Sequence, residues 1–265
     1  MSVAMDPFSP AGDEREVRLL GGTAIDGAPV AYIVVLSAVV TTLAFIPFTV
    51  VLASGGSFPM SQGIFALLGL LLGPVAGAVA SGIGTLIGIF VAPHTAGVWP
   101  VSLLGAVLTS FAAGSVAGTG RRRFLPVPVF LVALLGLGLY LGRAVLVIGI
   151  PLRTAVLGSA LDWSALLMFL SPLRPLVARL TRSASMSRVA MGLGLGTWMA
   201  YGMAHAVQDG ITYYLFNWPE QIWVMLIPIV PFEMLFRCAV GMVIGTGVIS
   251  GLRAIGLVRP THAMY

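Results

Sequence analysis

Long apolar runs follow one another through most of this chain, with only short polar breaks between them. A helix needs about 20 mainly apolar residues to cross the roughly 30 Å hydrocarbon layer of a bilayer. Of the 265 residues, 58% are hydrophobic and 9% are charged, whereas a soluble domain carries roughly 25% charged residues. The sequence therefore predicts an all-α fold, a polytopic integral membrane helical bundle, and excludes a soluble globular domain.

Eight of these runs are candidate spans, and together they form one transmembrane domain over residues 30–254. The run at 161–180 is interrupted by two prolines and two arginines, so it is either a broken span or a helix that lies along the membrane interface. We therefore expect six to eight transmembrane helices. The candidate spans are 30–52, 59–73, 74–92, 100–118, 125–150, 161–180, 189–216 and 221–252.

Arginine supplies every strongly basic side chain, since the chain has no lysine. If eight spans alternate, the loops of one side hold eight arginines and those of the other side hold only Arg153. Positively charged short loops stay in the cytoplasm, so both termini are expected there, as polar tails over 1–29 and 255–265. The first tail lacks the apolar segment of a secretory signal peptide. The arginines of the cytoplasmic side are Arg121, Arg122, Arg123, Arg179, Arg182, Arg188, Arg253 and Arg259.

Small residues recur at every fourth position around the run at 74–92, along two lines of the predicted helix. Membrane helices approach closely where small residues face each other, because burial gives apolar side chains no advantage over lipid. The lines are either internal packing surfaces or the interface with a partner subunit. They comprise Gly73, Gly77 and Ser81 on one side of the helix and Ala76, Ala80, Gly84 and Gly88 on the other.

Five ionisable residues lie inside predicted spans away from their cytoplasmic ends, all at similar depth between the midplane and the outer face: Arg143, His205, Asp209, Glu233 and Arg237. Each charge costs about 2.5–3.5 kcal/mol to insert, so a charge without a partner or a role is unfavourable there. Glu233 and Arg237 are four positions apart and face each other on a helix. They form either a structural ion pair or part of an aqueous pocket in which the guanidinium binds a carboxylate or a phosphate.

A polar and aromatic stripe runs along the seventh candidate span, with aromatic, histidine and aspartate side chains at spacings of three and four. Lipid does not tolerate the acidic group, so the stripe must face protein or a water-filled cavity. The short outer loop that follows this span supplies two further residues for the rim of such a cavity. The candidate substrate-binding residues are Arg143, Trp198, Tyr201, His205, Asp209, Asn217, Trp218, Glu233 and Arg237.

No catalytic, cofactor or metal motif accompanies these residues in the sequence. The single cysteine, Cys238, lies in an apolar run and has no second cysteine with which to form a CxxC pair. Neither a GxxxxGK[ST] phosphate-binding loop nor an HExxH motif is present. We therefore expect no enzymatic activity, no cofactor, no bound metal and no nucleic-acid partner.

The stretch FIPFTVVLASGGSFPMSQGIFALLGLLLGPVAGAVASGIGTLIGIF at 45–90 resembles the membrane-embedded substrate-binding (S) components of energy-coupling factor (ECF) transporters. The resemblance consists of a proline-containing outer loop, a short second span, and a Gly-Pro pair that opens a glycine-rich third span, here Gly73 and Pro74. The last run, PIVPFEMLFRCAVGMVIGTGVISGL, is similar to the closing helix of that family.

The resemblance implies a vitamin-uptake protein of a prokaryotic inner or plasma membrane, which captures a small anionic or amphipathic organic solute at its outer face. It also implies partners, namely a transmembrane coupling subunit and two cytoplasmic ATPase subunits. These would supply the energy that a chain without a phosphate-binding loop cannot obtain from ATP. The loop that would cover the site consists of Ser54, Gly55, Gly56, Ser57 and Phe58.

Three other functions remain open on the residues alone. A proton- or ion-coupled secondary transporter could relay protons through His205, Asp209 and Glu233. An intramembrane enzyme acting on a lipid or peptide could use His205 with Asp209 as a general base and a serine of the outer loop, Ser54 or Ser57, as nucleophile. The third alternative is a structural subunit of a larger complex.

Overall fold

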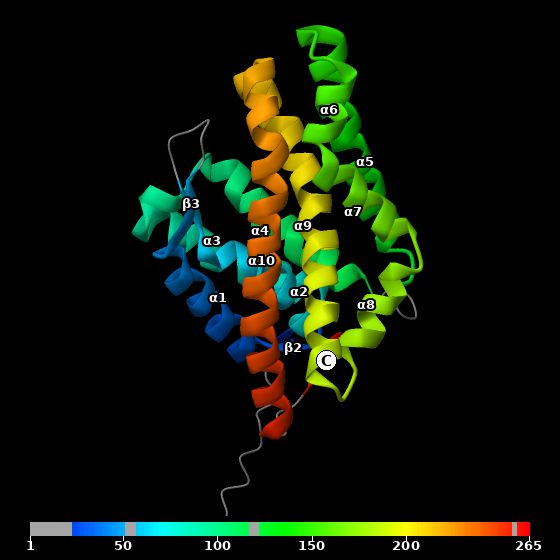
Figure 1. The fold of residues 1–265 in the computed structure, drawn as a ribbon. Helices are drawn as coiled ribbons and strands as arrows, with labels where there is room; N and C mark the ends of the chain where they lie inside the picture. The colour runs from blue at the N-terminus through cyan, green and yellow to red at the C-terminus, as the bar shows by residue number, and fades with distance from the viewer. Residues whose placement is uncertain (1–22, 51–56, 117–121, 256–258) are drawn as a thin grey trace, which may run out of the picture.

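The computed structural model of the chain describes residues 23–50, 57–116, 122–255 and 259–265. In these parts the chain forms an all-α bundle (Figure 1), as the sequence predicts. The helices are α1 (Val30–Ala44), α2 (Phe65–Leu72), α3 (Pro74–Val91), α4 (Trp99–Ser115), α5 (Pro126–Gly142), α6 (Leu152–Gly158), α7 (Ala160–Leu170), α8 (Leu173–Thr181), α9 (Met186–Phe216) and α10 (Glu220–Ala254). The smaller elements are the strands β1 (Ala24–Ile25), β2 (Ala28–Pro29), β3 (Pro47–Val50) and β4 (Ser57–Pro59), the 3-10 turns η1 (Met60–Gly63) and η2 (Pro93–Thr95), and the π-helical turn η4 (Arg143–Ile148).

Three helices of the described chain are long and apolar enough to cross a membrane: α3, α5 continued through η4, and α10. A fourth results if α6 and α7, which meet at an angle of 63°, are one bent span. Large apolar side chains of these helices lie exposed on the outside of the bundle, among them Leu135 of α5 and Val243 of α10. Such surfaces are unstable in water, so the helices indicate a membrane-embedded protein.

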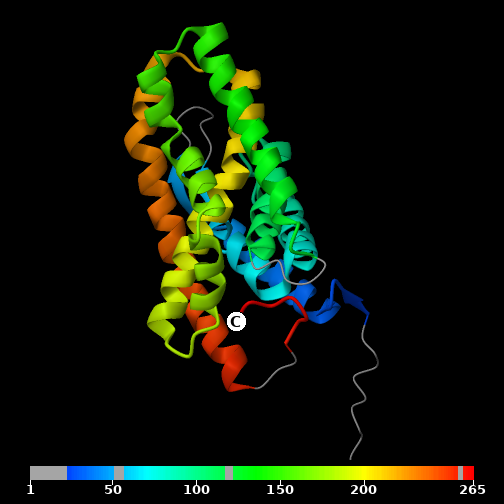
Figure 2. The ribbon, with the colours of Figure 1, turned by 90° about the vertical axis from the view of Figure 1, so that its right-hand side faces the viewer.

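The chain passes up and down the bundle, and its two described ends lie together at the lower end in Figures 1 and 2. α1 and α3 run parallel, since Gly84 of α3 faces Val40 of α1 and Gly88 faces Ala44. α9 runs in the same direction, and α10 returns beside it. At the upper end, α5, α9 and α10 extend beyond the level reached by α1 to α4 (Figure 1).

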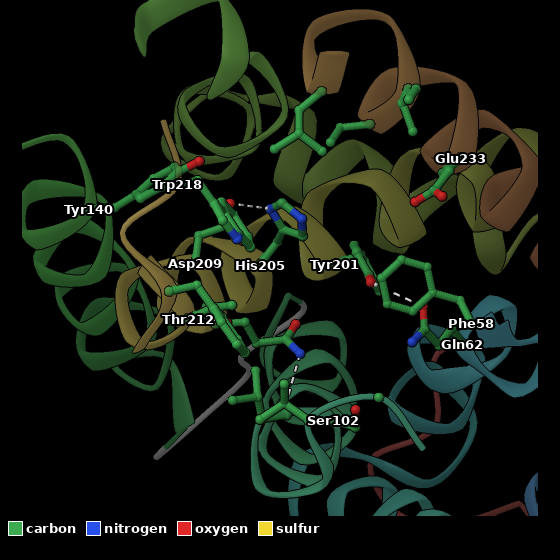
Figure 3. A pocket seen from close by; sticks show the side chains of 18 of the residues that line it. Phe58, Gln62, Ser102, Tyr140, Tyr201, His205, Asp209, Thr212, Trp218 and Glu233 are labelled. Atoms are coloured by element: carbon green, nitrogen blue, oxygen red, sulfur yellow. Dashed lines mark hydrogen bonds and ion pairs between the residues drawn. The ribbon is translucent and has the colours of Figure 1, made fainter. Parts of the chain in front are cut away.

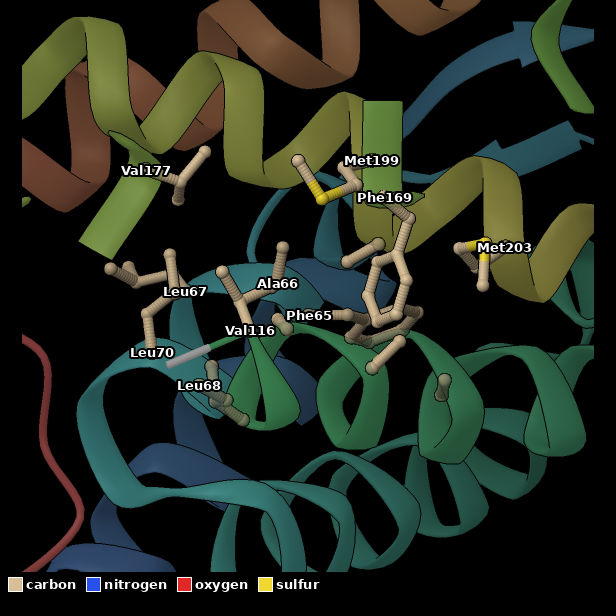
Figure 4. Packing of buried hydrophobic residues seen from close by; sticks show 14 of the residues in the cluster. Phe65, Ala66, Leu67, Leu68, Leu70, Val116, Phe169, Val177, Met199 and Met203 are labelled. Atoms are coloured by element: carbon tan, nitrogen blue, oxygen red, sulfur yellow. The ribbon is translucent and has the colours of Figure 1, made fainter. Parts of the chain in front are cut away.

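Helix α9 is the centre of the bundle, because it packs against α2, α4, α5, α7, α8 and α10. Its polar side chains are therefore surrounded mainly by protein rather than by lipid, which explains how a helix less apolar than most of its neighbours can lie inside the bundle. The short helix α2 packs against it, and all eight residues of α2 are buried. Figure 4 shows this contact, with Phe65 of α2 near Met199 and Met203 of α9.

The two lines of small residues on α3 are internal packing surfaces. A Cβ atom on Gly77 would lie 2.7 Å from the Cα atom of Gly69 in α2, and one on Gly84 would lie 2.6 Å from the carbonyl oxygen of Ser37 in α1. Burial within the chain removes the alternative of a partner interface on these lines. The buried members are Gly73, Ala76, Gly77, Ala80, Ser81, Gly84 and Gly88.

Several of the eight candidate spans are not a single α-helix; the run at 59–73, for example, contains η1 and the short helix α2. The first helix ends at Ala44 rather than near residue 52, because Pro47 cannot continue a helix and begins the strand β3. The sixth candidate span is broken into α7 and α8 at Ser171 and Pro172. The helix that could join α7 in one bent span is α6, and α8 belongs to no candidate span of the described chain.

The polar segments at the two ends pack onto the bundle where the structure describes them. Asp26, in the tight turn between β1 and β2, accepts two hydrogen bonds from the guanidinium of Arg122. At the other end, the backbone N–H of Met264 donates to a carbonyl of α2 at 2.8 Å. Residues 24–29 and 259–265 are therefore part of the folded domain, although the sequence assigned them to polar tails.

Candidate functional site

A cavity of about 140 Å³ lies between the upper halves of α9 and α10 and reaches η1, the start of α4, and α5 (Figure 3). Charged and aromatic side chains line it, and they come from segments that are far apart in the sequence. Six of the nine predicted substrate-binding residues are among the lining residues: Tyr201, His205, Asp209, Trp218, Glu233 and Arg237.

The guanidinium of Arg237 lines this cavity and is almost fully buried. Its Nε donates to the side-chain oxygen of Gln62 at 3.0 Å, and its two terminal nitrogens approach Glu233 Oε2 at 3.4 and 3.5 Å. The ion pair expected from the i,i+4 spacing is therefore present but long for a charge-assisted hydrogen bond. Because a guanidinium carries five N–H donors, two donors of Arg237 are left for a ligand.

Three aromatic rings enclose the same guanidinium. The Cζ atom of Arg237 lies 5.2 Å from the ring centre of Phe48, 4.9 Å from that of Phe58 and 4.6 Å from that of Tyr201. Phe48 also stacks on Phe236, with ring centres 5.0 Å apart. Cation–π contacts of this kind attract a buried cation, so Arg237 holds the β3–β4 hairpin against α9 and α10.

The loop predicted to cover the site belongs to this hairpin, and the structure describes only its last two residues. Phe58 lines the cavity and packs on Arg237. The hydroxyl of Ser57 donates to the carbonyl of His94 at 3.2 Å and so joins the hairpin to η2. The other three predicted loop residues, Ser54, Gly55 and Gly56, lie outside the described residues.

A second polar cluster lies in the upper half of α9 at the edge of the cavity. His205 Nδ1 is 2.9 Å from Asp162 Oδ1 and 3.0 Å from Asp209 Oδ2. Asp162 comes from the first turn of α7 and is completely buried, and its Oδ2 atom has no hydrogen-bond partner among the described residues. Figure 3 shows His205 and Asp209 side by side on the cavity wall.

Three predicted site residues lie away from the cavity lining. Arg143 Nε donates to Asn217 Oδ1 at 2.8 Å, and the guanidinium stacks over Tyr214, so this pair joins the upper ends of α5 and α9. Trp198 donates through Nε1 to the hydroxyl of Ser164 at 3.1 Å and thereby ties α9 to α7. These contacts give Arg143, Asn217 and Trp198 roles in holding helices together.

Sequence reasoning missed three polar residues of this region. Asp162, at the start of the sixth candidate span, was not among the candidate residues, whereas α6 and the bent α7 carry it into the bundle beside His205. Gln62 and Gln208 are neutral and escaped a search limited to ionisable groups; Gln208 donates to the carbonyl of Val101 at 2.9 Å and fixes α9 to α4. A glutamine within an apolar run was the signal that could have identified both.

The arrangement can bind a small solute that carries both a charged and an apolar part. Arg237 offers free N–H donors, and Tyr201, Phe58 and Trp218 offer aromatic faces to the same cavity. Comparisons with protein families, with curated proteins and with solved structures find no match for this chain. The candidate site therefore stands on its geometry.

Proposed function

We propose that the protein is a membrane-embedded solute-binding protein that takes up a small organic solute from the outer face of the membrane. The observation that carries the proposal is Arg237, a buried guanidinium with two uncommitted N–H donors at the wall of the cavity. A buried charge is costly unless it is paired. Glu233 pairs with it at long distance only, which favours a carboxylate or phosphate of the solute as its closer partner.

The dimensions of the cavity support a compact solute. At about 140 Å³ it is smaller than the roughly 300–1,000 Å³ typical of pockets for drug-sized ligands. A vitamin-like or similar small metabolite with one anionic group and an apolar or aromatic body fits this description. Its anionic group would bind Arg237, and its body would lie between Tyr201 and Trp218.

The proposed orientation of the protein in the membrane follows from the positions of its arginines. The arginine-rich connections lie at the end of the bundle where the chain termini lie, and this end would face the cytoplasm. The cavity would then open toward the outside of a prokaryotic plasma membrane. Delivery of the solute inward would depend on partner subunits of the ECF type, a transmembrane coupling protein and two cytoplasmic ATPases, because this chain has no phosphate-binding loop.

Native mass spectrometry of the gently purified protein tests the proposal, followed by identification of any small molecule that is released on denaturation. The released compound is then titrated into protein that has been washed free of it. We expect Arg237→Lys to weaken binding by about 10-fold or more, because an ammonium cannot form the paired hydrogen bonds. Arg143→Lys, outside the cavity lining, is the matched control and should bind as the unmodified protein does. Equal affinity in all three proteins would refute the assignment of Arg237.

A proton-coupled secondary transporter is the second candidate, and the position of His205 between two carboxylates favours it. Intramembrane acid and histidine groups are the usual components of proton relays. Uptake of the same compound into liposomes that contain this chain alone, driven by a pH gradient, would support this candidate. The intramembrane enzyme has less support, because the hydroxyl of Ser57 binds a carbonyl near η2 and not His205.

A further inference from the structure

The Nδ1 atom of His205 is a meeting point for two carboxylates that approach from different helices. Asp162 Oδ1 of α7 lies 2.9 Å from it and Asp209 Oδ2 of α9 lies 3.0 Å from it, and the three atoms lie within 4.8 Å of one another. Metal–ligand distances for imidazole and carboxylate are about 2.0–2.2 Å, so two ligands at right angles around one ion are about 3 Å apart. The two distances from His205 Nδ1 to the carboxylate oxygens match those between neighbouring ligands of a single cation.

Hydrogen bonds within the cluster do not satisfy its charge. The Nδ1 atom of an imidazole carries one proton, so it can donate one full hydrogen bond, to Asp162 or to Asp209. The Oδ2 atom of Asp162 is completely buried and has no partner among the described residues. The guanidinium of Arg237, which lines the same cavity, is bound to Gln62 and Glu233 and not to this cluster. A buried carboxylate with an unpaired oxygen is destabilising, and a cation at this point would remove that cost.

We propose that Asp162, His205 and Asp209 form a binding site for one divalent transition-metal cation. An imidazole nitrogen among carboxylate oxygens suits ions such as Zn²⁺, Co²⁺ or Mn²⁺, whereas Ca²⁺ and Mg²⁺ favour sets made only of oxygen. Asp162 would bind from the protein interior, where its unpaired oxygen is available as a second donor atom. His205 and Asp209 line the cavity, so the open coordination position faces it.

The cation would give the cavity a second anion-binding point in addition to the guanidinium of Arg237. Three protein ligands leave at least one position for water or for an oxygen atom of a solute. The inference concerns the cluster itself and does not depend on the proposed uptake function. It also goes against the sequence-based expectation of no metal, which did not consider Asp162.

Titration of the purified, chelator-treated protein with CoCl₂ tests the site, because Co²⁺ bound by nitrogen and oxygen in a low-symmetry site shows visible d–d absorption. Calorimetry with ZnCl₂ gives the affinity and stoichiometry. We expect saturable binding of one ion per chain and a rise in the thermal unfolding temperature with Zn²⁺. Asp162→Asn and His205→Gln should each weaken binding by more than the roughly 10–100-fold that loss of an outer-shell partner costs.

Glu233→Gln is the matched control, since Glu233 is another buried carboxylate on the same cavity but lies outside the cluster. It should bind Co²⁺ as the unmodified protein does. If Asp162→Asn does not fold, Asp209→Asn at the more accessible edge of the cluster replaces it. Unmodified protein without d–d absorption or Zn²⁺-dependent stabilisation would overturn the proposal, and so would equal loss of binding in Glu233→Gln.

Discussion

Nε of Arg237 donates a hydrogen bond to the side-chain oxygen of Gln62 at 3.0 Å, although the two residues are 175 positions apart in the chain. The same oxygen accepts a hydrogen bond from the hydroxyl of Tyr201 at 3.2 Å. One amide oxygen therefore joins η1, α9 and α10 at the wall of the cavity. Each of the three side chains is at most 6% exposed, so water cannot replace these bonds.

Replacement of Gln62 by leucine should destabilise the protein by about 2–3 kcal/mol, because a buried charged donor loses its acceptor. Reversible unfolding in mixed detergent micelles measures the change. Tyr201→Phe is the control, since it removes one neutral hydrogen bond to the same oxygen and should cost about 1 kcal/mol. Equal effects of the two substitutions would contradict the importance assigned to the charged donor.

Loss of one of the three aromatic rings that surround Arg237 should loosen the β3–β4 hairpin. We expect Phe58→Ala to raise hydrogen-exchange rates in residues 57–63, because a desolvated cation–π contact is worth about 2 kcal/mol. Mass spectrometry of exchanged peptides measures this. Phe124→Ala removes a similar contact with Arg123 at the opposite end of the bundle and should leave residues 57–63 unchanged. Unchanged exchange in Phe58→Ala would mean that Arg237 does not hold the hairpin.

A methyl group on Gly77 should be poorly tolerated. Its Cβ atom would lie 2.7 Å from the backbone of Gly69, so α2 and α3 would have to move apart, at a cost of about 2 kcal/mol or more. Gly138→Ala is the matched control, because nothing lies within 4 Å of a Cβ atom there; it should be neutral or stabilising by up to about 1 kcal/mol. Thermal unfolding in detergent distinguishes the two, and equal stability of both variants would refute internal packing at Gly77.

The ion pair of Asp26 with Arg122 should make the stability of the protein depend on pH. Burial raises the pKa of this carboxyl, but hydrogen bonds from Arg122 and from the Val75 N–H outweigh burial and hold the pKa below its ordinary value. A group whose pKa is lowered by folding adds stability above its unfolded pKa, about 3.9, and that stability is lost as the pH falls through the folded pKa. The chain should therefore lose this contribution only in acid.

The comparison with Asp26→Asn isolates this effect, since asparagine also accepts the positive φ of 57° at this turn position. Unfolding temperatures of the two proteins should differ most near neutral pH and converge as the pH falls below about 4. Arg122→Gln should reduce stability at neutral pH in the same way. A difference that stays constant from neutral to acid pH would show that the Asp26 charge does not stabilise the fold.

Much of the fold follows from local sequence chemistry. The third helix was expected at 74–92 and is found at Pro74–Val91, because Pro74 suits the first helical turn and Gly73 adopts a φ of +91° that other residues rarely accept. Hydropathy could not separate the buried helix α2 from a lipid-facing span, since both are apolar. The difference depends on which helices surround it, and that is a tertiary property.

The contacts of the candidate site were predictable only where both interacting residues lie on the same helix. The pairs Glu233–Arg237 and His205–Asp209 follow from the i,i+4 spacing on α10 and α9. Asp162 approaches His205 from 43 positions away, through a 63° bend that no periodic pattern encodes. Arg143 was expected to line the cavity, but the π-helical turn at the end of α5 directs it to Asn217 instead.

The central position of α9 has a consequence for biosynthesis. A ribosome completes α2, α4, α5, α7 and α8 before it reaches residue 186, and all five pack against α9 in the finished bundle. Until then the faces that these helices turn toward α9, including the carboxylate of Asp162 that contacts His205, lack that neighbour. The central packing of the bundle is therefore completed only after α9 has been made.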